Sequence, residues 1–173
     1  MSTQKLHESY LNADEATLEL LLREASDRIA SQVELLVATD TRSLGLLSVS
    51  ATLATAATAI FADKLGVAGA QPLANAALSA AILLVLSAAF AAWALRPVSV
   101  AVRGWDPELF TDDIAQRKTA AQIRAEMLYH LQQRISTNVQ VAKFNARSVR
   151  ISMFFLALAP VVALIAAGVS ANS

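Results

Sequence analysis

The sequence contains no cysteine and little charge, and both deficits narrow the class of protein. Without cysteine, disulfides and thiolate metal sites are excluded. Charged residues make up 16% of the 173 residues and hydrophobic residues 55%, whereas a soluble domain carries about 25% charged residues. The formal net charge is zero, so no polyanion, and hence no nucleic acid, is indicated as a partner. This composition favours a membrane protein.

The sequence also lacks the motifs that carry chemistry. Neither a GxSxG elbow, nor a Walker A loop, nor a GxGxxG turn occurs. His7 and His130 have no second ligand three or four residues later in the chain, so neither favours a metal site. The acidic pairs at residues 14–15 and 112–113 stand at predicted helix starts, where capping explains them better than acid–base chemistry does. We therefore expect no enzyme, no cofactor and no metal site.

Three stretches without charged side chains are long enough to cross a bilayer. They lie at residues 44–62, 65–95 and 151–173. A helix needs about 20 apolar residues to cross the hydrocarbon core, because no water is present there to pair with the backbone. We predict membrane spans at 44–62, 73–95 and 149–169. Serine and threonine dilute the first span, and a buried soluble helix is its alternative.

The distribution of lysine and arginine predicts the orientation of the chain. Of the 14 such residues, only Lys64 lies in the short loop 63–72. Cytoplasmic flanks carry the excess of positive charge, so this loop and the tail 170–173 are expected to be periplasmic. The cytoplasmic segments are then residues 1–43, 96–112 and 113–148. No apolar signal-peptide core precedes the first span, so we expect a multi-pass protein of the bacterial inner membrane with a retained, cytoplasmic N-terminus.

Two long amphipathic helices are predicted to lead into the first and third spans. The first follows a capping pattern at Asn12 and Glu15, and the second begins near residues 111–113. Each carries one apolar stripe at near-heptad spacing. The stripes are Leu18, Leu22, Ala25, Ile29, Val33 and Leu36 in the first helix, and Ile123, Met127, Leu131, Ile135, Val139 and Ala142 in the second.

These helices are predicted to be continuous with their spans, because almost no glycine or proline interrupts them. The fold class is therefore all-α: three transmembrane helices with two cytoplasmic extensions that form a helical hairpin stalk. Pro160 is predicted to kink the third span. The apolar faces need cover from each other, from further copies or from a partner protein, and the thin core of two helices favours a homo-oligomer.

Two further segments leave alternatives open. Trp105, in the linker after the second span, is assigned either to the lipid headgroup region, which we prefer, or to the helical body. The first span carries small residues four positions apart, which let helices approach closely. These rows serve packing within the subunit, which is the favoured interpretation, or else a subunit interface or the wall of a pore. They consist of Ser48, Thr52 and Ala56, and of Ala51, Thr55 and Ala59.

One stretch carries a resemblance to a known family. Residues 38–44, which lead from an amphipathic helix into a small-residue span, resemble the same region in transmembrane effectors of bacterial anti-phage systems. The effectors of the cyclic-pyrimidine (Pycsar) and related nucleotide-signalling systems are the most similar. The second span ending in Arg96-Pro97, and the long helix through Leu131 and Ile135 to Lys143, are similar in layout.

The resemblance implies an effector that oligomerises and damages the inner membrane. Its signal would be a cyclic nucleotide or another ligand bound on the cytoplasmic helices. The resemblance transfers no functional residue to this sequence. The alternative is a non-catalytic accessory or scaffold subunit, whose stalk holds a cytoplasmic protein partner within a larger membrane complex.

Overall fold

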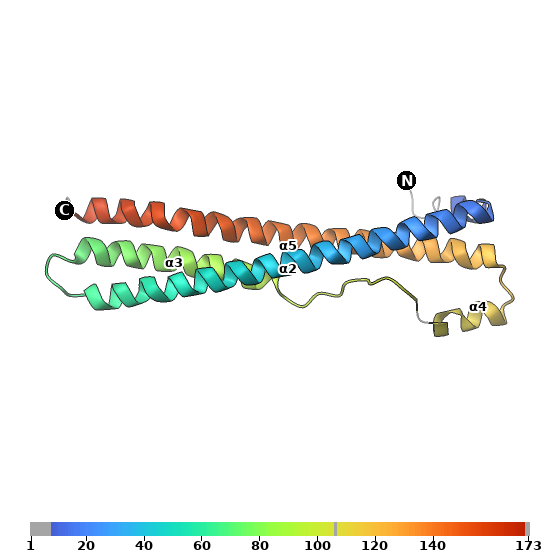
Figure 1. Cartoon of the computed structure of the whole chain (residues 1–173), viewed down its shortest axis with the longest axis horizontal. Helices are drawn as coiled ribbons and strands as arrows, with labels where there is room; N and C mark the ends of the chain where they lie inside the picture. The colour runs from blue at the N-terminus through green and yellow to red at the C-terminus, as the bar shows by residue number, and fades with distance from the viewer. Residues whose placement is uncertain (1–7, 106, 172–173) are drawn as a thin grey trace. The chain divides into compact units, whose positions relative to one another are not determined.

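The computed structural model describes residues 8–105 and 107–171, and the regular structure in these ranges is helical (Figure 1). The long helices are α2 (Glu15–Lys64), α3 (Gln71–Ala94) and α5 (Ala120–Ala171), and the 3-10 helix η1 (Pro107–Phe110) and α4 (Thr111–Ala115) lie between α3 and α5. Each long helix contains a segment long and apolar enough to cross a membrane. The predicted all-α membrane fold is confirmed. His7 and the last two residues of the predicted tail lie outside the described residues.

The described residues form two compact units. The first, here called the polar unit, contains the described residues up to Val37 together with Val98–Ala142. The second, the membrane unit, contains Ala38–Pro97 and the described residues from Lys143 onward. Both α2 and α5 continue from one unit into the other without a break in the helix, which confirms the predicted continuity.

Helix α2 is capped by Asp14, two residues after the predicted cap Asn12. The Asp14 carboxylate accepts hydrogen bonds from the backbone N–H of Thr17 at 2.9 Å and from the Thr17 hydroxyl at 2.7 Å. These bonds hold the Asp14 pKa below its ordinary value, because they stabilise the ionised form. Asn12 instead donates to the backbone oxygen of Glu8. The predicted capping pattern was therefore wrong, because the carboxylate of Asp14 is the better-placed acceptor for the first turn.

Helix α5 also begins later than predicted. The short helix α4 ends at Ala115, and Arg117 then adopts a left-handed conformation with a φ of 55°, which ends a helix. Helix α5 restarts after Thr119, whose hydroxyl accepts from the N–H of Gln122 at 3.3 Å while the Gln122 side chain accepts from the N–H of Thr119 at 2.9 Å. This reciprocal pair is a capping box, and it starts the helix at Ala120 rather than near residues 111–113.

In the polar unit, α2 packs against the first part of α5. Leu18 is buried against Ala125 and Leu128, and Ile29 is buried against Leu131 and Ile135. The half-buried Leu22, Ala25 and Val33 complete these clusters. Burial of a side chain such as Leu or Ile stabilises the fold by about 1.5–3 kcal/mol, so these clusters hold the two helices together.

In the membrane unit, α3 packs antiparallel to α2 after a tight turn (Figure 1). Gly66 and Gly69 in this turn have φ values of 77° and 75°, which an ordinary L residue rarely adopts, so they break the helix as predicted. The core of this unit consists largely of alanine, which permits close approach of the helices. Its buried members are Ala54, Ala57, Ala81, Leu84 and Ala159.

Three fully buried serines, one from each helix, join the membrane unit internally. The Ser87 hydroxyl lies 2.9 Å from the Ser50 hydroxyl and 3.1 Å from the Ser152 hydroxyl. Ser87 also bonds to the backbone oxygen of Ser152 at 2.9 Å, and the Ser152 hydroxyl bonds to the backbone oxygen of Ser87 at 2.8 Å. A hydroxyl in an apolar environment needs a partner, so this cluster sets the relative register of α2, α3 and α5.

Candidate functional site

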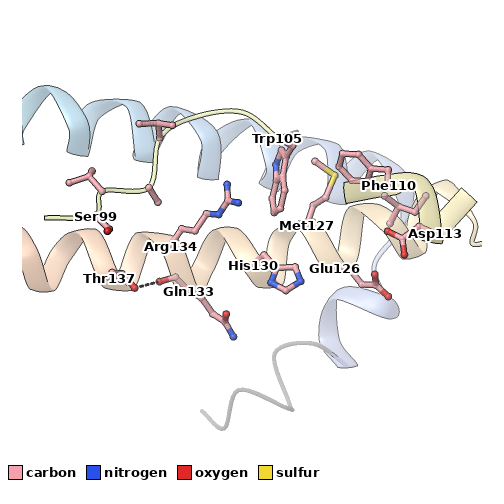
Figure 2. Close-up of a pocket in the computed structure, with 14 residues that line it drawn as sticks. Ser99, Trp105, Phe110, Asp113, Glu126, Met127, His130, Gln133, Arg134 and Thr137 are labelled. Carbon is pink, nitrogen blue, oxygen red and sulfur yellow. Dashed lines mark hydrogen bonds between the residues drawn. The ribbon is translucent and has the colours of Figure 1, made fainter. Parts of the chain in front are cut away.

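The polar unit contains a groove with a volume of about 790 Å³. One wall is the extended segment at residues 98–105 together with η1 and α4, and the other wall is one face of α5 (Figure 2). The volume falls within the range of small-ligand pockets, about 300–1,000 Å³. The residues that line it are Ser99, Val100, Ala101, Val102, Trp105, Phe110, Asp113, Ile123, Glu126, Met127, His130, Gln133, Arg134 and Thr137.

The extended wall is attached to α5 through one buried side chain. The amide of Asn138, which is fully buried, pairs with both backbone groups of Ala101: its Nδ2 donates to the Ala101 oxygen at 2.9 Å, and its Oδ1 accepts from the Ala101 N–H at 3.0 Å. The Asn138 side chain therefore pairs with both backbone groups of Ala101, as the backbone of a neighbouring β-strand would. Arg103 adds an exposed contact to Asp27 of α2 at 3.4 Å. The groove thus has a fixed wall and an open mouth.

Trp105 and Arg134 form the centre of the groove. The Arg134 guanidinium lies 4.2 Å from the centre of the Trp105 ring and donates a hydrogen bond to the backbone oxygen of Gly104 at 3.3 Å. The rings of His130 and Phe110 each lie 6.2 Å from the Trp105 ring (Figure 2). Trp105 also packs against the core around Ile29 and Leu131. The preferred assignment of Trp105 to the headgroup region was therefore wrong, and the alternative against the helical body is confirmed.

One end of the groove carries carboxylates held by a lysine. The ammonium of Lys118 lies 2.7 Å from Asp113 and 2.8 Å from Glu126. The hydrogen bonds that Lys118 donates, to Asp113 first and then to Glu126, raise the Lys118 pKa above its ordinary value, because both carboxylates stabilise the ammonium form. Lys118 therefore links α4 to α5 and leaves the remaining lone pairs of both carboxylates available as acceptors.

Most residues of the two predicted stripes lie in the core, with two exceptions. Leu18, Ile29, Leu36, Leu131 and Ile135 are buried, and Leu22, Val33 and Val139 are half-buried. Ile123 and Met127 line the groove instead. The stripe in this part of α5 was assigned to the wrong face, because Ala125 and Leu128 are the side chains that meet Leu18. The predicted stripe contained the large apolar side chains Ile123 and Met127, whereas the close contact with Leu18 is made by an alanine, Ala125.

The six small residues of the first span lie on the outer face of α2. Ser48, Ala51, Thr52, Thr55, Ala56 and Ala59 are all exposed, whereas Ser50, Ala54 and Ala57 face the helices of the same unit. The favoured interpretation, in which these rows pack within the subunit, was therefore wrong. The Thr52 and Thr55 hydroxyls each donate to a backbone oxygen one turn earlier at 2.9 Å. This face of α2 therefore presents these six small side chains, and its threonine hydroxyls at 52 and 55 already have hydrogen-bond partners within the helix.

Sequence reasoning missed Asn138, Arg134 and the serine cluster. One signal was available: Leu131, Asn138, Asn145, Ser152 and Ala159 recur at every seventh position of α5, and all five are buried. A polar side chain in a heptad position indicates a buried hydrogen bond that sets register. The pairing of Asn138 with Ala101 could not be found in this way, because Ala101 lies in a segment without periodic structure.

The groove brings together groups that can bind a small ligand. It offers the flat rings of Trp105 and Phe110, the cation of Arg134, and the acceptors Asp113 and Glu126. Among the described residues, no group of three or more metal-ligating side chains comes together. A small ligand with an aromatic ring, a single negative charge and hydrogen-bond donors matches these groups.

Comparisons with known proteins bear on the whole chain. The sequence model of one family, described as the Pycsar effector protein domain, matches residues 5–171. No curated protein and no solved structure matches the chain.

Proposed function

The chain belongs to the Pycsar effector family, and from this premise we propose that it assembles in the bacterial inner membrane and permeabilises the bilayer when a cyclic nucleotide binds the groove. The family assigns it to anti-phage defence. The proposed orientation puts the polar unit in the cytoplasm and the turn at residues 65–70 in the periplasm. The single observation that carries the proposal is that the wall of the groove leads directly into a membrane helix.

The connection between groove and membrane is covalent and short. Residues 99–102 line the groove, and only Leu95 to Val98 separate this wall from the end of α3. A ligand that enters between the wall and α5 contacts Ala101, the residue that Asn138 holds, and therefore acts on this part of the wall. Displacement of the wall therefore pulls on the end of α3, which is one of the three candidate membrane-spanning helices.

The chemistry of the groove supports a cyclic nucleotide as the ligand. Such a ligand has one flat base, one negative charge and the hydroxyl or amino donors of the sugar and base. Trp105 and Phe110 offer ring surfaces, Arg134 offers a cation for the phosphate, and the carboxylates bound to Lys118 offer acceptors.

The outer face of α2 supports assembly into an oligomer. Its six small side chains, Ser48, Ala51, Thr52, Thr55, Ala56 and Ala59, are exposed within one copy of the chain. Rows of small residues allow the backbones of two membrane helices to approach closely, and this gain in van der Waals contact drives helix association in lipid. A second copy covers this face better than lipid tails do.

The test uses the purified full chain in dye-loaded liposomes, with cyclic UMP, cyclic CMP and cyclic AMP as probes. We expect a cyclic pyrimidine nucleotide to release the dye. In Arg134→Gln the required concentration rises about ten- to hundred-fold, since a hydrogen bond to a charged group contributes about 1.5–3 kcal/mol. Gln140→Ala, an exposed change on α5 outside the groove lining, is the matched control.

Two results would contradict the proposal. If no probe changes dye release although the chain is inserted, the effector function proposed here is wrong. If gentle detergent extraction recovers one copy of the chain with a stoichiometric protein partner and no homo-oligomer, the scaffold alternative holds instead.

A further inference from the structure

A cation at the end of α3 is held by aromatic rings of the membrane unit. The guanidinium of Arg96 lies 4.1 Å from the centre of the Phe144 ring on α5 and 5.5 Å from the centre of the Trp93 ring on α3. Such stacking attracts a guanidinium to the ring faces and leaves its N–H groups directed outward from the edge. Arg96 is exposed, so these N–H groups are accessible.

Arg96 differs from the ion-paired cations of the polar unit in having no anion of its own. Lys118, Arg103 and Arg124 each contact a carboxylate. Within the residues that the structure describes, no ion pair or side-chain hydrogen bond involves the Arg96 guanidinium. A planar guanidinium held in one orientation, with its donors unused, is suited to bidentate binding of a phosphate group.

An apolar groove begins at the ring that holds this cation. It has a volume of about 290 Å³ and is lined by Ala89, Phe90 and Trp93, without a charged side chain. The Phe90 side chain is held in place, because its ring stacks on the Phe155 ring of α5 with centroids 5.8 Å apart. The Trp93 side is open, since this residue is 56% exposed. The groove lies along the membrane helix α3, on a surface that faces lipid.

We propose that Arg96 and this groove bind one anionic phospholipid, with the phosphate on the Arg96 guanidinium and an acyl chain along Ala89, Phe90 and Trp93. The Arg96 cation favours an anionic headgroup, and the apolar groove favours a hydrocarbon chain. An arginine and a tryptophan at the end of a membrane helix lie at headgroup depth, and an apolar groove that extends from there along the helix accepts a hydrocarbon chain. Basic sites beside membrane helices bind anionic headgroups in this way.

This site is independent of the nucleotide groove, and its role does not require membrane disruption. It joins α3 to α5 at the point where the linker begins, because the stacked rings come from both helices. A bound anionic lipid therefore stabilises the contact between Arg96 and Phe144.

The test measures quenching of Trp93 fluorescence by brominated lipids. The chain has two tryptophans, so the Trp105→Phe variant makes Trp93 the only reporter. The full-length protein is placed in phosphatidylcholine bilayers that contain either brominated phosphatidylglycerol or brominated phosphatidylcholine. We expect phosphatidylglycerol to be preferred about five-fold, since one arginine near the surface contributes about 1 kcal/mol toward an anionic lipid.

Three variants separate a specific site from general surface charge. Arg96→Gln is expected to remove the preference, whereas Arg150→Gln, which neutralises another exposed arginine of the membrane unit, keeps it. Arg96→Lys, which retains the charge without the planar donors, is expected to reduce the preference at least two-fold and serves if Arg96→Gln fails to insert. Ala89→Phe fills the groove and is expected to lower quenching by both brominated lipids.

An unchanged preference in Arg96→Gln would overturn the proposal, as would an equal loss in Arg96→Gln and Arg150→Gln. Excess inorganic phosphate distinguishes the source of the anion. We expect it to leave the quenching unchanged, because the acyl chain holds the lipid in place. Full displacement by inorganic phosphate would overturn the lipid assignment.

Discussion

Replacing Ser87 with alanine should destabilise the membrane unit by about 1–3 kcal/mol. The Ser87 hydroxyl is the only one of the three that bonds to both others, at 2.9 Å to Ser50 and 3.1 Å to Ser152. Alanine preserves the helix and the close packing, so the loss is confined to hydrogen bonds. Ser152 keeps its bond to the backbone oxygen of Ser87, whereas Ser50 loses its interhelical partner.

The magnitude follows from these contacts. A hydrogen bond between membrane helices contributes about 0.6 kcal/mol on average and at most about 1.7 kcal/mol. The Ser87 hydroxyl contacts the Ser50 hydroxyl and both the hydroxyl and the backbone oxygen of Ser152. Because one hydroxyl donates a single proton, the substitution removes the equivalent of two full bonds, or about 1.2 kcal/mol. A buried hydroxyl left without a partner costs about 1–3 kcal/mol. The unpaired hydroxyl is that of Ser50, which is fully buried. It can recover part of this cost by bonding to its own helix, which is why the lower half of the range is expected.

The assay is equilibrium unfolding of the full chain in mixed micelles with increasing SDS, followed by circular dichroism. Ser79→Ala is the matched control on the same helix, because the Ser79 hydroxyl bonds at 2.8 Å to the backbone oxygen of Asn75 one turn earlier, within α3. We expect this control to change the unfolding free energy by less than about 0.5 kcal/mol.

A double substitution sharpens the test. Once Ser87 is alanine, Ser50→Ala should cost nothing further or restore part of the stability, because replacing both partners removes the unpaired hydroxyl. The reasoning is refuted if Ser87→Ala and Ser79→Ala have equal effects, or if the effects of Ser50→Ala and Ser87→Ala simply add.

Three further predictions concern single groups. In Asn138→Ala, the Ala101 N–H loses its acceptor, so hydrogen exchange in residues 98–105 should accelerate at least ten-fold. Unchanged exchange would show that Asn138 does not hold this wall of the groove. Asn145 is buried with its Oδ1 unpartnered among the described residues. Asn145→Leu should therefore leave the unfolding free energy unchanged or raise it by up to about 1 kcal/mol. A decrease in unfolding free energy larger than about 1 kcal/mol would show that this oxygen has a partner. The cap at Asp14 stabilises the folded state above the unfolded pKa of about 4 and is lost as the pH falls through the lowered folded pKa. The protection factor of the first-turn amides of α2, which is the intrinsic exchange rate at each pH divided by the measured rate, should therefore fall with acid in the native chain. In Asp14→Ala it should be low at every pH. An identical pH profile of the protection factor in both chains would contradict this account.

Much of the fold could be predicted from local features of the sequence. The three spans follow from the length of uncharged stretches, and the turn between the first two follows from Gly66 and Gly69. The errors arose where two local signals competed. Asp14 displaced Asn12 as the cap of α2, and the capping box at Thr119 displaced the acidic residues before it.

The groove could be predicted only in part. Its α5 wall contains Ile123 and Met127, whose spacing suggested a packed face without indicating what packs there. The opposite wall lies in a linker with no regular structure, so neither period nor propensity points to its position. The same holds for the stacking of Arg96 on Phe144, whose partners lie on different helices.

The sequence by itself determined that this chain is helical and spans a membrane, because transfer of an apolar segment into lipid depends on that segment alone. It also determined the continuity of α2 and α5 through their polar and apolar parts, which needs only the absence of helix breakers. The tertiary structure decided which side of each helix is used. The small residues of the first span lie outside the core while Ser50 lies within it, and Asn138 holds a linker that no pattern could place. The reason is physical: buried hydrogen bonds and aromatic stacking join residues far apart in the chain, and their geometry exists only once the helices have packed.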